Sequence, residues 1–79
     1  NIYERNVTIM EMVKIKSEYI TLGQFLKYAN IVSSGGMVKA ILQDTKIYVN
    51  DILEARRGKK LYPGDKIVIK GHGEYRIGL

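Results

Sequence analysis

Apolar and polar residues alternate along the first part of the chain. The apolar positions of this alternation are Val7, Ile9, Val13 and Ile15. A period of two is typical of a half-buried strand, so the pattern predicts one over roughly residues 6–16. Glu11 interrupts the apolar face, and a helix is the alternative for this segment.

The period then changes to that of a helix. Thr21 and Gln24 have capping-box spacing, in which the hydroxyl accepts an amide three residues on and the glutamine reaches back. Residues of one apolar stripe follow at helical spacing: Leu22, Phe25, Leu26 and Ala29. Asn30 tolerates the left-handed conformation, so we expect the helix to end near residues 28–30.

A second helix is predicted only a few residues later. Ser34 is a good N-cap, and apolar residues recur at Val38, Ile41 and Leu42. This helix should run to about Asp44, and the short connection implies a helical hairpin or a corner like that of a helix-turn-helix.

The remainder of the chain alternates again and predicts short strands separated by turns. The predicted strands centre on Ile47 with Val49, on Ile52 with Leu53, on Ile67 with Ile69, and on Tyr75 with Ile77. The connecting turns are Asn50-Asp51, a type II turn at Tyr62-Pro63-Gly64-Asp65, and Gly71-His72-Gly73. The order β-α-α-β-β-β-β predicts one α+β domain over residues 1–79, a two-helix corner packed on a small, mostly antiparallel sheet.

Charge is concentrated in one short segment of the chain. Four of the five residues from Arg56 to Lys60 are cationic, and the 79-residue chain has a formal net charge of +5. Arginine and lysine together suit phosphate oxygens, which suggests an anionic partner such as nucleic acid or, less often, a membrane surface. A solvated loop that serves only solubility is the alternative for the segment taken alone.

Several classes of chemistry find no support in the sequence. The chain has no cysteine, so it has neither a disulfide nor a thiolate metal site, and no apolar run is long enough to cross a membrane. Its one histidine, His72, lies between two glycines in a predicted turn, and the acidic residues are scattered. We therefore expect no catalytic residues, metal, cofactor or small-molecule substrate, and no membrane partner.

These segments in this order resemble the RNA-binding domain named after ribosomal small-subunit protein four, here called the S-four domain. The resemblance covers residues 21–69, with a motif core of about 20–70. It rests on the capped helix, the helix opened by Ser34, the hairpin Ile47-Tyr48-Val49-Asn50-Asp51 and the strand entry Tyr62-Pro63-Gly64-Asp65-Lys66-Ile67. The chain is most similar to the small stand-alone bacterial YaaA/YbcJ branch.

The resemblance implies that the helix pair and the adjoining hairpin form a face that lies against structured RNA. The basic residues of these elements and of the loop after them are Lys27, Lys39, Lys46, Arg56, Arg57, Lys59 and Lys60. Many S-four domains have an arginine directly after the helix-opening serine, where this chain has Gly35. The Gly35-Gly36 pair that follows Ser34 is then expected to present bare helix N-terminal amides to a phosphate, with two glycines that permit tight packing of the helix corner as the alternative.

Two further residues of the hairpin are weaker candidates for RNA contact. Asn50 shapes the turn, with a backbone or 2′-hydroxyl contact as the alternative. Tyr48 is the tyrosine that we consider for stacking on an unpaired base, whereas most tyrosines bury their rings.

The sequence therefore predicts a non-catalytic, cytoplasmic protein that binds structured RNA, with ribosomal RNA or a ribosomal particle implied by the resemblance. One alternative is a basic interaction module for an acidic protein or an anionic surface. Another is an accessory domain of an RNA-modifying enzyme. Duplex DNA is also possible, because backbone charge alone does not distinguish the two polymers.

Overall fold

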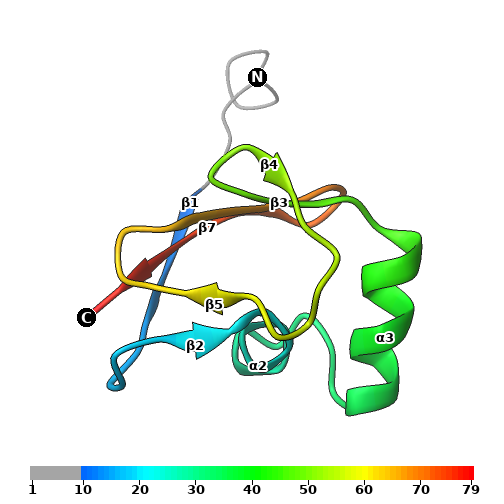
Figure 1. The fold of residues 1–79 in the computed structure, drawn as a ribbon, viewed down its shortest axis with the longest axis horizontal. Coiled ribbons are helices and arrows are strands. Elements are labelled where there is room, and N and C mark those ends of the chain that lie inside the picture. The colour runs from blue at the N-terminus through cyan, green and yellow to red at the C-terminus, as the bar shows by residue number, and fades with distance from the viewer. Residues whose placement is uncertain (1–9) are drawn as a thin grey trace, which may run out of the picture.

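The alternating segments form a five-stranded sheet in the computed structural model, which describes residues 10–79 (Figure 1). Its strands are β1 (Met10–Lys14), β3 (Ile47–Val49), β4 (Ile52–Leu53), β6 (Lys66–Ile69) and β7 (Gly73–Gly78). They lie in the order β1-β7-β6-β3-β4, in which only the β1–β7 pair is parallel. The strand predicted over residues 6–16 is confirmed for Met10–Lys14, and residues 6–9 lie outside the described part.

One face of this sheet is buried, as the alternation predicted. The buried residues of its strands and of the segment after β1 are Val13, Ile15, Ile47, Val49, Ile67, Ile69, Tyr75 and Ile77. They share one core with Phe25, whose ring meets that of Tyr75 edge-on at 5.5 Å. Burying a side chain of this size stabilises the fold by about 1.5–3 kcal/mol relative to exposing it. The helices are thereby held on one side of the sheet.

The first helix, α2 (Leu22–Tyr28), has the predicted capping box. The Gln24 amide donates to Thr21 Oγ1 at 3.3 Å, and the Thr21 amide donates to Gln24 Oε1 at 3.0 Å. Beyond the helix, Asn30 has a φ of 60°, which is the left-handed conformation expected there. Both ends of α2 are thus determined by local side-chain chemistry.

The second helix, α3 (Gly35–Asp44), begins after Ser34 as predicted. The Met37 amide donates to Ser34 Oγ at 3.3 Å, which satisfies one of the amides that a helix start leaves free. The buried Val38 anchors α3 on the core. The two helices form a corner, and α3 stands to the right of α2 in Figure 1.

Two turns of the hairpin region are joined by side chains. Asn50 and Asp51 have φ values of 51° and 70°, as in the two-residue turns that suit the twist of a hairpin. Gly64 has a φ of 98° in the second turn, which fits the predicted type II geometry. Asn50 Nδ2 donates to Asp65 Oδ1 at 3.0 Å, so the first turn is tied to the second.

The sequence did not predict a second, two-stranded sheet. Its strands are β2 (Ile20–Thr21) and β5 (Lys60–Leu61), which pair antiparallel. We call this pair the ribbon; Figure 1 shows it beside α2, across the core from the larger sheet. Strands of two residues are too short to show a period of two. The predicted order of elements was therefore correct, but β2 and β5 were missing from it.

Candidate nucleic-acid interface

The segment Arg56–Lys60, which we call the basic loop, is bonded through its backbone to the start of α2. The Leu22 amide donates to the Lys59 carbonyl at 2.8 Å, and the Gly23 amide donates to the Arg57 carbonyl at 2.8 Å. A helix leaves its first amides without partners inside the helix. The loop carbonyls satisfy two of them, so the path of the basic loop is fixed against α2.

Gly23 permits this close approach of loop and helix. A Cβ atom at this position would lie 3.4 Å from the Arg57 carbonyl oxygen and 3.5 Å from Val38 Cγ1. Those distances are ordinary van der Waals contact, so the backbone of the basic loop packs directly against the start of α2.

Arg56, at the start of the loop, is paired with an acidic residue. Its Nε and Nη2 atoms donate to the two carboxylate oxygens of Glu54 at 2.9 and 3.1 Å. The hydrogen bond from this guanidinium is the main reason why the pKa of Glu54 falls from 4.5 to about 2, and the pair raises the pKa of Arg56 in turn. The Arg56 side chain remains 75% exposed, but its charge is shared with Glu54.

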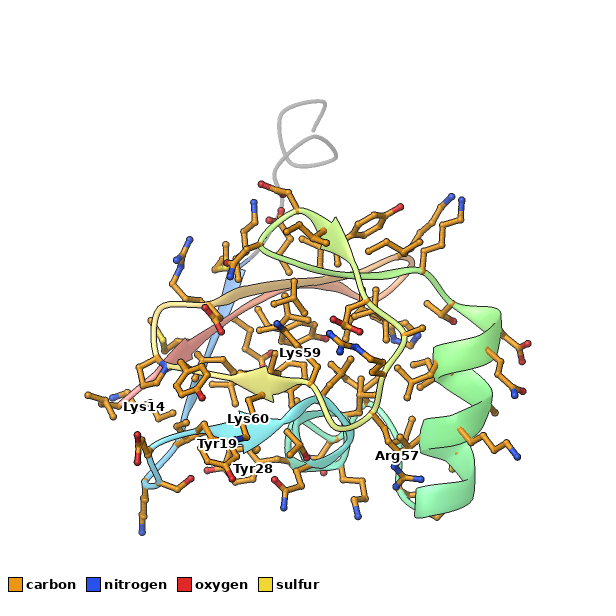
Figure 2. All side chains as sticks on the ribbon, in the orientation of Figure 1. Lys14, Tyr19, Tyr28, Arg57, Lys59 and Lys60 are labelled. Carbon is orange, nitrogen blue, oxygen red and sulfur yellow. The ribbon has the colours of Figure 1, made fainter. Side chains whose placement is uncertain are left out.

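The other cations of the basic loop lack such partners. Within residues 10–79, Arg57, Lys59 and Lys60 form no ion pair. Arg57 Nη2 is 3.9 Å from the position that a Cβ would take at Gly35, so this guanidinium lies at the start of α3 (Figure 2). The helix has Gly35 where the resemblance leads us to expect an arginine, and the guanidinium of Arg57 lies close to this position.

The remaining predicted residues are spread over the molecule. Lys27 and Lys39 are exposed on α2 and α3. Lys46 lies beyond the other end of α3, roughly 15 Å of helix from Gly35, and its carbonyl accepts the Lys70 amide. The structure brings Ser34, Gly35 and Arg57 together but leaves Lys46 apart from them.

Asn50 has a structural role in this arrangement. Besides its bond to Asp65, its Oδ1 atom accepts the Lys66 amide at 2.9 Å. Tyr48 is flanked in β3 by the buried Ile47 and Val49, so its side chain lies on the opposite face of the sheet. That face is turned away from the core, α2 and the ribbon.

Two tyrosines that sequence reasoning did not select lie beside the basic loop. The rings of Tyr19 and Tyr62 meet with their centroids 5.8 Å apart, and Lys60 Nζ lies 4.9 Å from the centroid of the Tyr19 ring. Figure 2 shows Tyr19 and Lys60 close together at the ribbon. The alternation Lys60-Leu61-Tyr62 is the signal in the sequence that could have indicated these residues. It shows which side chains share a face only once the pairing of β5 with β2 is known.

The described residues contain no group of three or more histidine, cysteine, aspartate or glutamate side chains placed to hold a metal ion. None of the helices formed by residues 10–79 has the length and apolarity needed to cross a bilayer.

The two capped helices and the hairpin after them are the elements on which the resemblance to the S-four domain rests. A family model described as the S4 domain matches residues 13–78, and the chain belongs to this family. This is the S-four domain that the sequence resembles. The chain is also similar to the Probable ribosome maturation protein RlbA of Bacillus subtilis (strain 168), with 48% identity over 65 residues. That alignment covers 82% of this chain and 92% of the relative.

Proposed function

We propose that this protein binds structured RNA without catalysing a reaction, and that its RNA is ribosomal RNA, free or in a maturing ribosomal particle. Membership of the S4 domain family supports an RNA or ribosome-related role. The printed name of the Bacillus subtilis relative assigns that protein to ribosome maturation. A cytoplasmic location follows from such a partner.

The observation that carries this proposal is the anchoring of the basic loop. Two hydrogen bonds of 2.8 Å hold its backbone on α2, and Arg57 projects from it to the start of α3. Cations on a fixed backbone lose less conformational entropy on binding than cations on a mobile loop. A solvated loop that serves only solubility has no need of such anchoring.

The chemistry of this face suits a folded RNA. Duplex RNA presents mainly phosphates and 2′-hydroxyls to a protein surface, so charge and shape determine recognition. The candidate phosphate contacts come from the basic loop and the two helices: Arg57, Lys59, Lys60, Lys27 and Lys39. Contact with ~4–5 phosphates gives a slope of log affinity against log salt of roughly −3.5 to −4.5.

The test is a binding titration over a salt series with a folded RNA hairpin, a DNA duplex of matched sequence and a single strand. The variant Arg57→Glu/Lys59→Glu should lose RNA binding by about a hundredfold at low salt, because two contacts become repulsive. The control Lys16→Glu/Lys70→Glu makes the same change of net charge at two exposed lysines outside the basic loop.

Equal losses in the two double variants would show that net charge alone governs binding, and the proposed site would be wrong. A salt slope near zero would refute phosphate recognition. If the protein bound the DNA duplex and the RNA hairpin with equal affinity, the proposed binding surface would stand, but the proposed preference for RNA would be wrong. If the protein bound no RNA, a partner recovered from nuclease-treated extract would favour the alternative of an acidic protein.

A further inference from the structure

We infer that the ribbon carries a stacking site for one unpaired nucleotide, in which Tyr62 receives the base and Lys60 meets its phosphate. This inference rests on the proposed function and deepens it. It predicts that the preferred RNA is a folded one with an unpaired nucleotide beside its helix, and not a fully paired duplex.

The geometry of the ribbon puts the aromatic rings on its outer face. In the antiparallel pair, Ile20 lies opposite Leu61, and the next positions outward are Tyr19 and Tyr62. Because side chains alternate between the faces of a strand, Leu61 points into the core, where it is fully buried. Lys60 and Tyr62 then share the outer face with Tyr19.

Both rings of the ribbon are accessible to solvent. Tyr19 is 37% exposed and Tyr62 is 43% exposed. Neither hydroxyl makes a hydrogen bond to another residue in the described part of the chain, whereas the Tyr28 hydroxyl donates to the Lys14 carbonyl at 2.9 Å. The two rings contact each other and still offer aromatic surface to solvent.

The two tyrosines have different roles in this site. Lys60 Nζ already lies over the Tyr19 ring, so Tyr19 positions the ammonium by a cation–π contact. Tyr62 is the ring that remains for a ligand. Its position is fixed, because its amide donates to Asp65 Oδ2 at 2.8 Å and Asp65 in turn is bonded to Asn50.

The surroundings of Tyr62 select a nucleotide over an uncharged aromatic ligand. A hollow of about 560 Å³ is lined by Tyr62 together with Arg56, Gly58, Lys59 and Lys60. A base stacked on Tyr62 thus has cations within reach of its phosphate. The site is continuous with the basic loop, so a nucleotide leaving a bound helix passes directly from the phosphate-binding face to the ring. Stacking tolerates any base, because every base has a π-face.

The test compares two RNAs: a blunt duplex of about 16 base pairs, and the same duplex with one unpaired adenosine at its centre. Tyr62→Leu keeps the apolar bulk and removes the ring. We expect it to lose about tenfold in affinity for the bulged RNA and less than twofold for the blunt duplex, since base–aromatic stacking is a substantial part of single-strand binding. Tyr62→Phe keeps the ring and should bind both RNAs as the unmodified protein does.

Tyr48→Leu is the matched comparison, because Tyr48 lies on the opposite face of the larger sheet and should not matter. An equal loss for both RNAs in Tyr62→Leu, or a loss specific to the bulged RNA in Tyr48→Leu, would overturn the inference. Binding of both RNAs without any effect of Tyr62→Leu would refute the stacking site alone. Failure of the unmodified protein to bind either RNA would refute the proposed function as well.

A second measurement does not depend on a variant. Stacking shifts the ring-proton resonances of the aromatic side chain involved, so titration of the unmodified protein with the bulged RNA should shift those of Tyr62. The blunt duplex should leave them in place. Shifts of equal size with both RNAs would contradict the inference even if Tyr62→Leu did not fold.

Discussion

The cationic residues of the basic loop differ in how they are held. Arg56, at the start of the loop, forms an ion pair with Glu54 in which two atoms of its guanidinium donate to the two carboxylate oxygens. Further on, Arg57 and Lys59 are held by their backbone carbonyls, which accept amides from α2, and their side chains form no ion pair with the described residues. Two adjacent arginines thus differ in whether their charge is available to a ligand.

This difference teaches that a cluster of cations in a sequence overestimates the charge of a site. Glu54 neutralises one of the four positive charges of the basic loop. The other three side chains extend from a backbone that is hydrogen-bonded to α2. The anchor depends on the ribbon, since β5 continues directly from the basic loop. We therefore expect the largest effect from a change that destabilises the ribbon. Changes of RNA affinity should be smaller when an unpaired cation is removed, and smaller still when the Arg56–Glu54 ion pair is changed.

The largest effect is expected from Leu61→Ala, which removes the anchor of the ribbon. Leu61 is fully buried in the core, and large-to-small changes at such sites cost about 2–5 kcal/mol. A domain of this size has a free energy of unfolding near the lower end of 5–15 kcal/mol, so the variant should lose a large part of its free energy of unfolding. Urea unfolding followed by circular dichroism measures the change.

Leu53→Ala is the control for this prediction, because Leu53 is 59% exposed on β4. It should change the free energy of unfolding by no more than about 0.5 kcal/mol. Equal destabilisation by the two variants would show that the ribbon does not contribute more to the core than an exposed edge strand.

The sequence predicted the features that depend on neighbouring residues. The capping box of Thr21 with Gln24 and the positive φ at Asn50 arise within four residues of chain, so their residue types are informative by themselves. The buried faces of β3 and β6 followed from alternation over three or four residues.

The features that sequence reasoning missed join distant parts of the chain. β2 and β5 contain two residues each and are separated by about forty positions, so no local period indicates that they pair. The contact between the rings of Tyr19 and Tyr62 depends on that pairing and was missed with it. Glu54 is close to Arg56 in sequence, but counting charges did not reveal which cation it would compensate.

The second prediction compares the two arginines directly. Arg57→Gln should weaken binding to the RNA hairpin by about five- to tenfold at low salt and reduce the salt slope by about one, because it removes one phosphate contact. Arg56→Gln makes the same change of charge at the paired residue, and should leave the slope unchanged and the affinity within about twofold. Titrations over a salt series measure both, and equal changes in slope would remove the distinction between the two ends of the loop.

A smaller effect in the opposite direction is expected from Glu54→Gln. The glutamine keeps an acceptor for the Ala55 and Arg56 amides, which now donate to Glu54 Oε2 at 3.2 and 3.0 Å. It removes the charge that holds the guanidinium, so Arg56 becomes free to contact a phosphate. Affinity for the RNA hairpin should rise roughly two- to fivefold at low salt, and the salt slope should become steeper by about one. An unchanged slope would mean that Arg56 does not reach the RNA even when released.

The smallest effect is the pH dependence of the same ion pair. The pKa of Glu54 is about 2 in the folded protein, below its ordinary value of 4.5. A carboxyl whose pKa is lowered by folding stabilises the fold above its unfolded pKa, and this contribution is lost as pH falls through the folded one. The unmodified protein should therefore be more stable than Glu54→Gln at pH 7, and the difference should shrink as pH falls from about 4.5 towards 2. Other carboxyls titrate in both proteins and cancel in the difference.

Because the guanidinium is exposed, added salt should also reduce the difference in stability at pH 7. A difference that stayed constant from pH 7 to pH 3 would show that Glu54 orders the loop through its backbone contacts and not through the charge of Arg56.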